Sequence, residues 1–252
     1  MDNSLFAKVD ALAGRLAGLG PLSKETAARL MDAFMIESTV DSIAMERRSL
    51  ALSGTLQILK EGKPTENKPQ QMHQEAVGHR RAFELMLKEA VPGAALTEDI
   101  IKRIHSLVLT TDPESRGVYR IYPVSLRSAA HMPPQPRLIP ALMETLLADF
   151  HSMKRETHII RALAEFHLRF AGIQPFNDGN SRTNRLVMNL ELIKAGLLPI
   201  NIKSSDREKY YGCYDMYFRE GLSSGALAEL MAGYEIYELN RHISIRENEI
   251  NL

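Results

Sequence analysis

The sequence contains one cysteine, no excess of positive charge and no long apolar run. Cys213 is the only cysteine among 252 residues, which excludes an internal disulfide framework and a zinc site built from several cysteines. The 31 Lys and Arg residues equal the 31 Asp and Glu residues, so bulk electrostatics does not favour a nucleic-acid partner. No stretch approaches the roughly 20 apolar residues of a membrane span, so no membrane partner is expected. A cytoplasmic protein is the expectation.

Helical periodicity dominates what is present. Apolar residues recur every three or four positions in five segments, a spacing typical of helices with one buried face. Thr97 is the predicted N-cap of one of them, because Glu98 and Asp99 follow it. Two more helices are predicted at about 206–220 and 224–242, so the predicted fold class is all-α. The five stripes are Met72, Ala76, Phe83 and Leu87; Ile100, Ile104, Leu107 and Val108; Leu142, Leu146, Phe150 and Met153; Leu163, Phe166, Phe170 and Ile173; and Leu186, Leu190, Ile193 and Leu197.

The segment from Ile173 to Arg185 carries the strongest functional signal. It connects two helical stripes, and Pro175 and Gly179 break the pattern, so it is predicted to end one helix and begin the next. Backbone N–H groups at the start of a helix lack partners and lie at the positive end of its dipole. Such a terminus binds anions, and phosphate is the common biological case.

Two arginines follow in the first turn of that second helix. Arg182 and Arg185 lie three residues apart, close enough in angle to contact one ligand, and arginine suits two-pronged phosphate contacts. Asp178 offers a hard oxygen ligand beside them, as a Mg²⁺ ion that bridges nucleotide phosphates requires. From these residues alone, a helix-capping turn with two solvated arginines is the alternative, since many proteins with such a turn bind nothing.

The same stretch resembles the signature of the Fic (Fido) family, His-x-Phe-x-(Asp/Glu)-Gly-Asn-Gly-Arg-x-x-Arg. The resemblance extends beyond this signature and covers about residues 25–240. The further segments that are similar to the family are 161–167, 186–189, 117–134 and the pair Tyr210 and Tyr211. The resemblance implies a single domain over 1–252, a Fic-fold helical bundle. Within it, 24–62 would be an N-terminal helical segment and 97–240 the core. Residues 117–134 have β-type side chains and prolines, and would form a short β-hairpin flap that aligns a target protein.

The resemblance also implies a function, namely transfer of AMP from ATP, with Mg²⁺, to a hydroxyl of a protein side chain. The implied partners are a nucleotide and an unidentified target protein that docks on the flap, and a homodimer is left open. Phe176 would anchor the loop, and Tyr210 and Tyr211 would lie near the nucleotide. By position in the family signature, Asp178 would be the metal ligand. The anion hole would be formed by Gly179, Asn180 and Ser181, and the phosphates would be bound by Arg182 and Arg185.

Two residues of the motif depart from the family pattern. Gln174 stands where the family has the histidine that accepts the proton of the target hydroxyl, and an amide cannot act as a base. Loss of general-base catalysis costs roughly 10²- to 10⁴-fold in rate. His167 is too far along the helix to replace it, His131 belongs to the flap, and His105 and His151 are expected to be ordinary helical residues. Ser181 replaces a glycine, which would strain any backbone position that needs a positive φ.

An upstream segment resembles the family's inhibitory helix, (Ser/Thr)-x-x-x-Glu-(Gly/Asn), here Ser42 to Arg47. Ser42 and Glu46 lie one helical turn apart on one face, and Arg47 replaces the usual Gly or Asn. The resemblance implies that the glutamate pairs with the second arginine of the motif, so Glu46 is predicted to pair with Arg185 and to oppose productive ATP binding.

Three hypotheses follow from these residues. The first, favoured by the retained anion-site residues together with Gln174, is a nucleotide-binding protein whose AMP transfer is lost or much reduced. The second is an active transferase of AMP or another phosphate group that uses a different base. The third is a protein-interaction module without catalysis, and retention of Asp178, Asn180, Arg182 and Arg185 argues against it.

Overall fold

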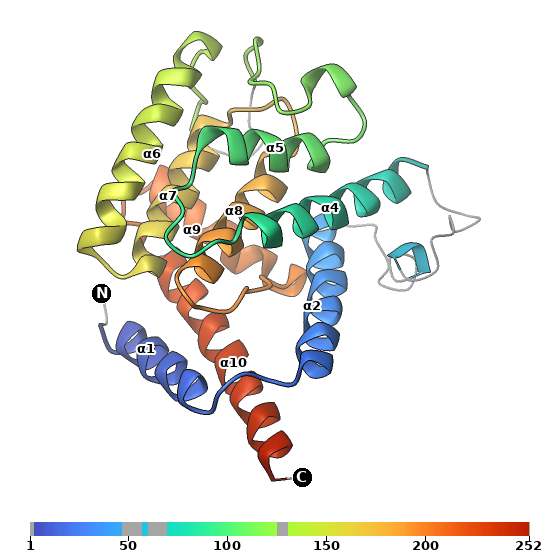
Figure 1. Ribbon diagram of the computed structural model, residues 1–252. Helices are drawn as coiled ribbons and strands as arrows, with labels where there is room; N and C mark the ends of the chain where they lie inside the picture. The colour runs from blue at the N-terminus through green and yellow to red at the C-terminus, as the bar shows by residue number, and fades with distance from the viewer. Residues whose placement is uncertain (1–2, 47–56, 60–69, 125–130, 252) are drawn as a thin grey trace.

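The computed structural model describes residues 3–46, 57–59, 70–124 and 131–251, and these are mainly helical (Figure 1). The helices are α1 (Asn3–Gly18), α2 (Lys24–Ala44), α4 (Gln70–Glu89), α5 (Glu98–Val108), η1 (Pro113–Ser115), η2 (Pro136–Leu138), α6 (Ile139–Glu156), α7 (Ile159–Ile173), α8 (Asn180–Lys194), η3 (Ser204–Asp206), α9 (Arg207–Phe218) and α10 (Gly225–Ile250). The expected all-α class is confirmed for this part of the chain. Within the same residues, no helix is both long and apolar enough to cross a membrane.

Helices α7 and α8 form the centre of the molecule (Figure 1), and nearly every residue of α8 is buried. Helix α6 packs on α7. Helices α4 and α5 both pack on α8, and α2 contacts α4 and α8. The predicted N-cap of α5 is confirmed, since the Thr97 hydroxyl accepts a hydrogen bond from the N–H of Ile100 at 3.3 Å. The hydrophobic core therefore surrounds the two helices that flank the motif, which fixes the loop between them at both ends.

The C-terminal end of α8 differs slightly from the stripe predicted through Leu197. The helix stops at Lys194, and Gly196 follows with φ 81°. The N–H of Gly196 bonds to the carbonyl of Ile193, and the N–H of Leu197 bonds to that of Leu192, which is a Schellman ending. Leu197 is still buried, because the reversed chain returns its side chain to the core.

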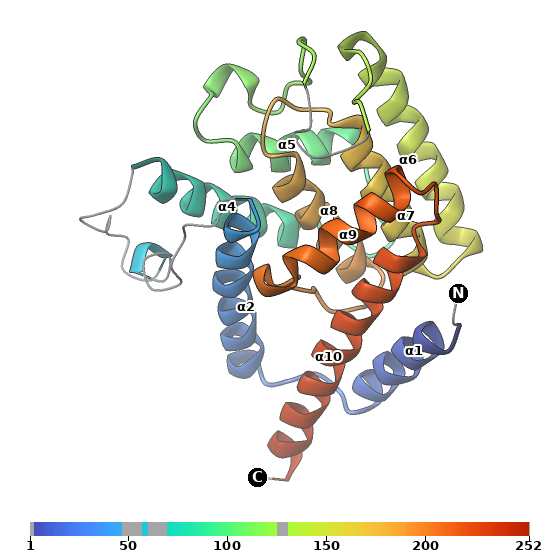
Figure 2. The same ribbon diagram turned by 180° about the vertical axis from the view of Figure 1, so that it is seen from behind.

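Helix α10 continues to Ile250, past the predicted end at 242 (Figure 2). Its last turns lie along α1 and the loop that follows it. Arg15 pairs with Glu247 at 2.6 Å, the Ser23 hydroxyl donates to Glu249 at 3.0 Å, and Arg246 donates to the carbonyl of Leu19 at 3.2 Å. The predicted boundary was wrong because contacts with a segment more than 200 residues away support these turns.

The β-hairpin flap expected at 117–134 is not present in the described part of that segment. Residues 117–124 and 131–134 contain no strand, and residues 125–130 lie outside the described residues. Instead of a partner strand, the segment pairs with the motif loop: the N–H of Arg120 donates to the carbonyl of Pro175 at 2.9 Å. The buried Arg120 guanidinium donates to the carbonyls of Gln174, Tyr122 and Pro134 at 2.7–3.0 Å, so a side chain replaces the ladder of a hairpin.

Candidate functional site

The motif loop, residues 174–179, connects α7 to α8 as the sequence predicts. Gln174 ends α7 with φ 48°, the one positive φ among the described residues that are not glycine. Gly179 precedes α8 with φ 73°, a second left-handed position, which glycine adopts without strain. Ser181 already lies inside α8, and the strain anticipated for a serine at this position does not occur.

Phe176 holds this loop against α5. Its side chain is fully buried, and its ring stacks on the imidazole of His105 with centroids 3.7 Å apart and planes 4° from parallel. The side chain of Asn180 braces the same residue. Its Oδ1 accepts from the N–H of Phe176 at 2.9 Å, and its Nδ2 donates to the carbonyl of Phe176 at 2.7 Å. Both polar atoms of the Asn180 side chain therefore hold the loop in shape, and only the backbone N–H of this residue is available to an anion.

His105 belongs to the site, although the sequence marks it as an ordinary helical residue. Its Nε2 lies 2.9 Å from the carbonyl of Asp178, and its Nδ1 accepts from the N–H of Gly117 at 2.9 Å. Both bonds require the neutral ring with the proton on Nε2. Burial, helped by the positive charge of Arg182, lowers the pKa of His105 to about 4. The sequence signal was its spacing of four from Ile101 and one from Ile104, which places it on the buried face of α5.

The N-terminus of α8 offers uncapped backbone donors. The first intrahelical bond runs from the N–H of Thr183 to the carbonyl of Gly179 at 2.9 Å, and no side chain caps the helix. The N–H groups of Asn180, Ser181 and Arg182 precede this bond, so they lack intrahelical partners. Together with the helix dipole they form the kind of terminus that binds oxyanions.

A single carboxylate bridges both arginines of the motif. Glu46 Oε2 lies 3.0 Å from Arg182 Nε, and Glu46 Oε1 lies 3.3 Å from Arg185 Nη2. The ion pair predicted between Glu46 and Arg185 is thus present, and the pair with Arg182 is additional. Both guanidinium groups are more than 90% buried, so solvent screens these contacts little. A carboxylate therefore occupies the arginine faces that the sequence assigns to phosphate.

Ser42 of α2 also binds Arg185. Its hydroxyl lies 3.1 Å from Nε and 2.9 Å from Nη2 of the arginine, and its carbonyl accepts from Nη2 at 2.8 Å. The buried Nη1 of Arg185 has no hydrogen-bond partner among the described residues. Arg185 therefore keeps one free donor while α2 holds the others. Arg47, which completes the inhibitory pattern, lies outside the described residues.

Asp178 lies at the surface beside these cations. Its side chain is 53% exposed, its Oδ1 accepts from the N–H of Gly179 at 2.7 Å, and its Oδ2 is 3.5 Å from Arg182 Nη2. In the described part of the chain, no group of three or more His, Cys, Asp or Glu residues is arranged to hold a metal ion. A cation at Asp178 would need its other ligands from phosphate oxygens and water, which is how Mg²⁺ is commonly held beside nucleotides.

The side chains of Gln174, His131 and His151 each contact a backbone carbonyl. The Gln174 amide donates to the carbonyl of Ala171 at 2.8 Å, so it caps its own helix. Nε2 of His131 lies 2.9 Å from the carbonyl of Gly172, and its ring stacks on Phe218. His151 contacts the carbonyl of Leu96 through Nε2, away from the motif loop.

His167 instead joins a buried cluster with two tyrosines of α9. Its Nε2 lies 2.6 Å from the hydroxyl of Tyr210 and 3.0 Å from that of Tyr214, and the two hydroxyls are 2.7 Å apart. The family resemblance implied that Tyr210 and Tyr211 would lie near a nucleotide, but it did not indicate Tyr214 or this cluster. Burial lowers the pKa of His167 to about 3, and the positive charge of Arg185 adds to this effect.

The buried neutral histidines make stability sensitive to acid. His167 and His79 both have a pKa of about 3 in the folded state, mainly because burial disfavours their charged forms. In the unfolded chain their pKa is about 6.5, so from pH 6.5 down to about 3 the unfolded state binds more protons. We expect the free energy of unfolding in urea to fall from pH 7 to pH 5, by on the order of 1–2 kcal/mol for each such histidine.

The variant His167→Gln tests this assignment. Over the same range, the slope of its unfolding free energy against pH should correspond to about one fewer proton taken up on unfolding than in the unchanged chain. In the unchanged chain, the His167 imidazole should keep the NMR shift of a neutral ring down to pH 4. Equal pH dependence in the variant and the unchanged chain would contradict the assignment.

Comparisons with known proteins found a family model that includes this loop and several similar proteins. Residues 95–192 match the model of the Fic/DOC family. Proteins called protein adenylyltransferase Fic are similar to the chain: that of Drosophila willistoni is 28% identical over 213 residues, covering 84% of this chain and 42% of the relative. That of Drosophila melanogaster is 31% identical over 172 residues, covering 68% and 35%. The chain therefore spans less than half of the length of these relatives.

Solved structures show the same fold. A Fic-domain-containing signalling protein from Bacteroides thetaiotaomicron superposes with a TM-score of 0.86 at 24% identity, over 96% of this chain and 98% of that one. Residues 134–508 of Fic-1 from C. elegans superpose with a TM-score of 0.83 at 23% identity, over 96% and 71%. Both structures match nearly the whole chain, from the N-terminal helices to α10.

Proposed function

The chain carries a Fic domain, and from this premise we propose that it binds ATP with Mg²⁺ at the motif loop and has lost or much reduced AMP transfer. The relatives are named as protein adenylyltransferases, and the chain retains the residues through which the proposed site would hold nucleotide phosphates. One observation carries the proposal: the Glu46 carboxylate bridges Arg182 and Arg185 beside the uncapped start of α8.

Phosphate recognition would use donors that the fold already orients. The N–H groups of Asn180 and Ser181 would bind one phosphate at the helix terminus, next to the flexible-backbone position Gly179. Arg182 and Arg185 would bind the remaining phosphate oxygens, because their guanidinium groups already share one oxyanion, the Glu46 carboxylate. Asp178 would contribute one carboxylate oxygen to Mg²⁺, which neutralises phosphate charge when bound.

Autoinhibition is proposed from the same contacts. Glu46 lies just past the end of α2, where Ser42 also binds Arg185, so α2 holds the arginine in a state that competes with phosphate. The small gap beside Ser42, His79 and Arg185 has a volume of about 20 Å³, which is enough for about one water and not for a phosphate group. Nucleotide would therefore have to displace Glu46 from Arg185.

Weak or absent transfer is proposed because Gln174 stands where the Fic family has its catalytic histidine. Gln174 offers an amide, which cannot take the proton of an attacking hydroxyl. Positioning by the loop and electrostatic stabilisation by the arginines would remain, so residual activity is compatible with this site. The target protein would dock on the segment around Arg120, where Ile121, Tyr122 and Met132 are 72%, 67% and 86% exposed.

Calorimetric titration of ATP·Mg²⁺ tests the proposed site. We expect the variant Glu46→Gly to bind about tenfold more tightly than the unchanged chain, because phosphate no longer competes with a carboxylate. We expect Arg185→Ala to bind about 10- to 100-fold more weakly, because it loses hydrogen bonds to a charged ligand. Glu46 lies beyond the last turn of α2, so glycine there does not interrupt the helix.

Glu37→Gln is the matched control, since Glu37 lies on α2 but pairs with the partly exposed Lys203 instead of the motif. Its affinity for ATP·Mg²⁺ should equal that of the unchanged chain. No detectable nucleotide binding even in Glu46→Gly would overturn the proposed function and favour a protein-interaction module.

A further inference from the structure

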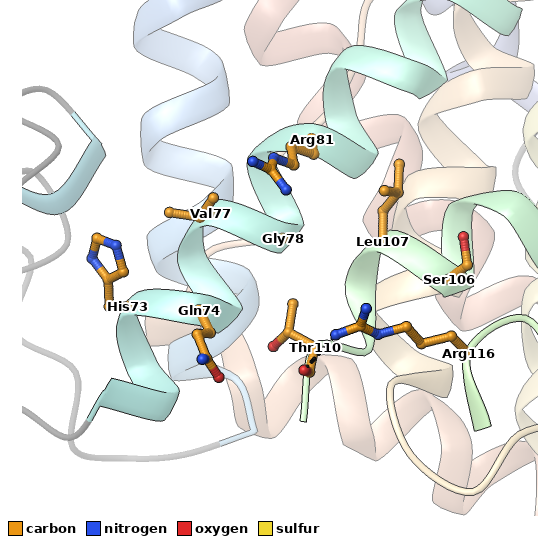
Figure 3. A pocket seen from close by; sticks show the side chains of 9 residues that line it. All are labelled: His73, Gln74, Val77, Gly78, Arg81, Ser106, Leu107, Thr110 and Arg116. Carbon is orange, nitrogen blue, oxygen red and sulfur yellow. Dashed lines mark hydrogen bonds between the residues drawn. The ribbon is translucent and has the colours of Figure 1, made fainter. Parts of the chain in front are cut away.

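A second cavity, distinct from the motif loop, lies between α4 and the segment that follows α5 (Figure 3). Its volume is about 240 Å³, below the roughly 300–1,000 Å³ of pockets that hold drug-sized ligands. It is lined by His73, Gln74, Val77, Gly78, Arg81, Ser106, Leu107, Thr110 and Arg116. This set contains two guanidinium groups and no carboxylate, so the lining carries net positive charge.

Gly78 brings the two walls of this cavity close together. A Cβ atom at this position would lie 2.4 Å from Thr110 Cγ2 and 2.5 Å from the carbonyl oxygen of Leu107, so a larger residue would push α4 away from α5. The close approach places Arg81 and Gln74 of α4 opposite Thr110 and Arg116. Figure 3 shows the Arg116 side chain extending from its loop toward Thr110, while Gln74 and Arg81 come from α4.

The cavity holds polar side-chain atoms that lack hydrogen-bond partners. The hydroxyl oxygen of Thr110 and Nδ1 of His73 are buried, and neither has a partner among the described residues. Arg81 is exposed, and it has no ion pair or hydrogen bond within the part of the chain that the structure describes. Buried polar atoms without partners are rare in native proteins, and a bound ion or water can supply the missing hydrogen bond.

Arg116 is held in place by the backbone and keeps a donor free. Its Nε donates to the carbonyl of Leu109 at 2.8 Å, and its Nη2 donates to the carbonyl of Thr110 at 2.7 Å. Neither bond neutralises its charge, which the nearby Asp112 carboxylate offsets only in part, and its Nη1 has no hydrogen-bond partner among the described residues. A guanidinium fixed in this way loses little conformational freedom when it binds an oxyanion.

We propose that this cavity binds a phosphate-sized oxyanion, either inorganic phosphate or the phosphate group of a small metabolite. Arg81 and Arg116 supply the charge, and the hydroxyl of Thr110 supplies a directed hydrogen bond. The site shares no lining residue with the motif loop, so the inference is independent of the proposed nucleotide binding. Its segment does touch that loop, because the side chain of Asn177 donates to the Ser115 hydroxyl at 3.0 Å.

Titration of inorganic phosphate into the full chain, followed by calorimetry at constant ionic strength, tests the proposal. We expect Arg81→Gln to weaken phosphate binding about fivefold, a typical effect for an exposed charge. Arg81 has no partner to lose among the described residues, so the variant should fold as the unchanged chain does. Arg103→Gln is the matched control, since Arg103 is an exposed arginine of α5 that pairs with Glu89 and does not line the cavity.

The variant Thr110→Val is a second test, because it should raise the melting temperature and lower the affinity for phosphate. The valine has nearly the same shape and removes a hydroxyl that has no partner among the described residues, so without phosphate the melting temperature should rise by about 2 °C. In the same variant phosphate should bind more weakly. Arg185→Ala separates the two anion sites, because it should leave phosphate binding in this cavity unchanged.

Two results would overturn the proposal. The first is that Arg81→Gln and Thr110→Val bind phosphate with the same affinity as the Arg103→Gln control. The other is phosphate binding that disappears in Arg185→Ala, which would place the anion at the motif loop. Addition of a phosphate monoester such as glycerol phosphate then shows whether the site takes inorganic phosphate alone or also a phosphate carried by an organic group.

Discussion

Replacing Gln174 with histidine is expected to raise AMP transfer by about 10²- to 10⁴-fold, the contribution that a general base makes to proton transfer. An imidazole can accept the proton of an attacking hydroxyl near neutral pH, which the Gln174 amide cannot. The measurement is labelling of proteins in a cell lysate by radiolabelled ATP. The comparison should be made in a Glu46→Gly background, so that competition for Arg185 does not limit nucleotide binding.

The local backbone suits this change. Gln174 has φ 48°, in the left-handed region that histidine enters more readily than most residues. Its carbonyl accepts from the buried Arg120 at 2.7 Å, and its N–H bonds to the carbonyl of Phe170 at 3.1 Å, so the backbone is held whatever side chain is present. The substitution exchanges one hydrogen bond, from the amide to Ala171, for an imidazole at the same position.

Gln174→Asn in the same background is the control, because it shortens the side chain without adding a base. Its labelling should stay at the level of the Glu46→Gly variant. Equal labelling with glutamine and histidine at this position would show that the site does not use histidine chemistry, and strong labelling in both would favour a transferase with a different base.

Replacing Phe176 with alanine is expected to destabilise the protein by about 3–5 kcal/mol, the usual cost of removing a buried aromatic side chain. The ring is fully buried, stacks on His105 and contacts Tyr119 at a centroid distance of 5.4 Å. For a domain of this size, each 1 kcal/mol lowers the melting temperature by roughly 2–4 °C, so the shift should exceed about 6 °C. Thermal unfolding followed by circular dichroism measures it.

Phe176→Ala should also weaken ATP binding in the Glu46→Gly background, because the loop that presents the α8 terminus loses its anchor. Tyr237→Ala is the control for removal of an aromatic ring, since Tyr237 is 62% exposed on α10 and a surface substitution changes stability by only about 0.5 kcal/mol. Melting temperatures that agree between the two variants would contradict the anchoring role.

Much of the site was accessible from the sequence because its signals are local. The break at Pro175 and Gly179, the two arginines three apart and the helix that follows are all encoded within about a dozen residues. Capping works over the same range, and the N-cap at Thr97 is present as predicted. Backbone preferences and helical spacing act between near neighbours, so a single sequence is enough to identify them.

The contacts of His105 and Arg120 could not be predicted in this way, because each depends on a residue far away in the chain. His105 stacks on Phe176, and Arg120 replaces the expected hairpin by binding carbonyls on both sides of the motif loop. Nothing next to either residue in the sequence indicates these partners. Similarly, α10 reaches Ile250 because α1 packs along it, and no local signal marks that extension.

The sequence alone therefore determined the all-helical class, the position of the loop and the residue types at the proposed anion site. The family resemblance predicted the pair of Glu46 with Arg185, and only the tertiary structure showed that the same carboxylate also contacts Arg182. Packing of α2 against α8 places the Glu46 carboxylate between Arg182 and Arg185, and the close crossing at Gly78 creates the cavity beside Arg81. Burial makes such charge contacts strong because it removes screening by water, and which charges become buried together is a property of the packed helices.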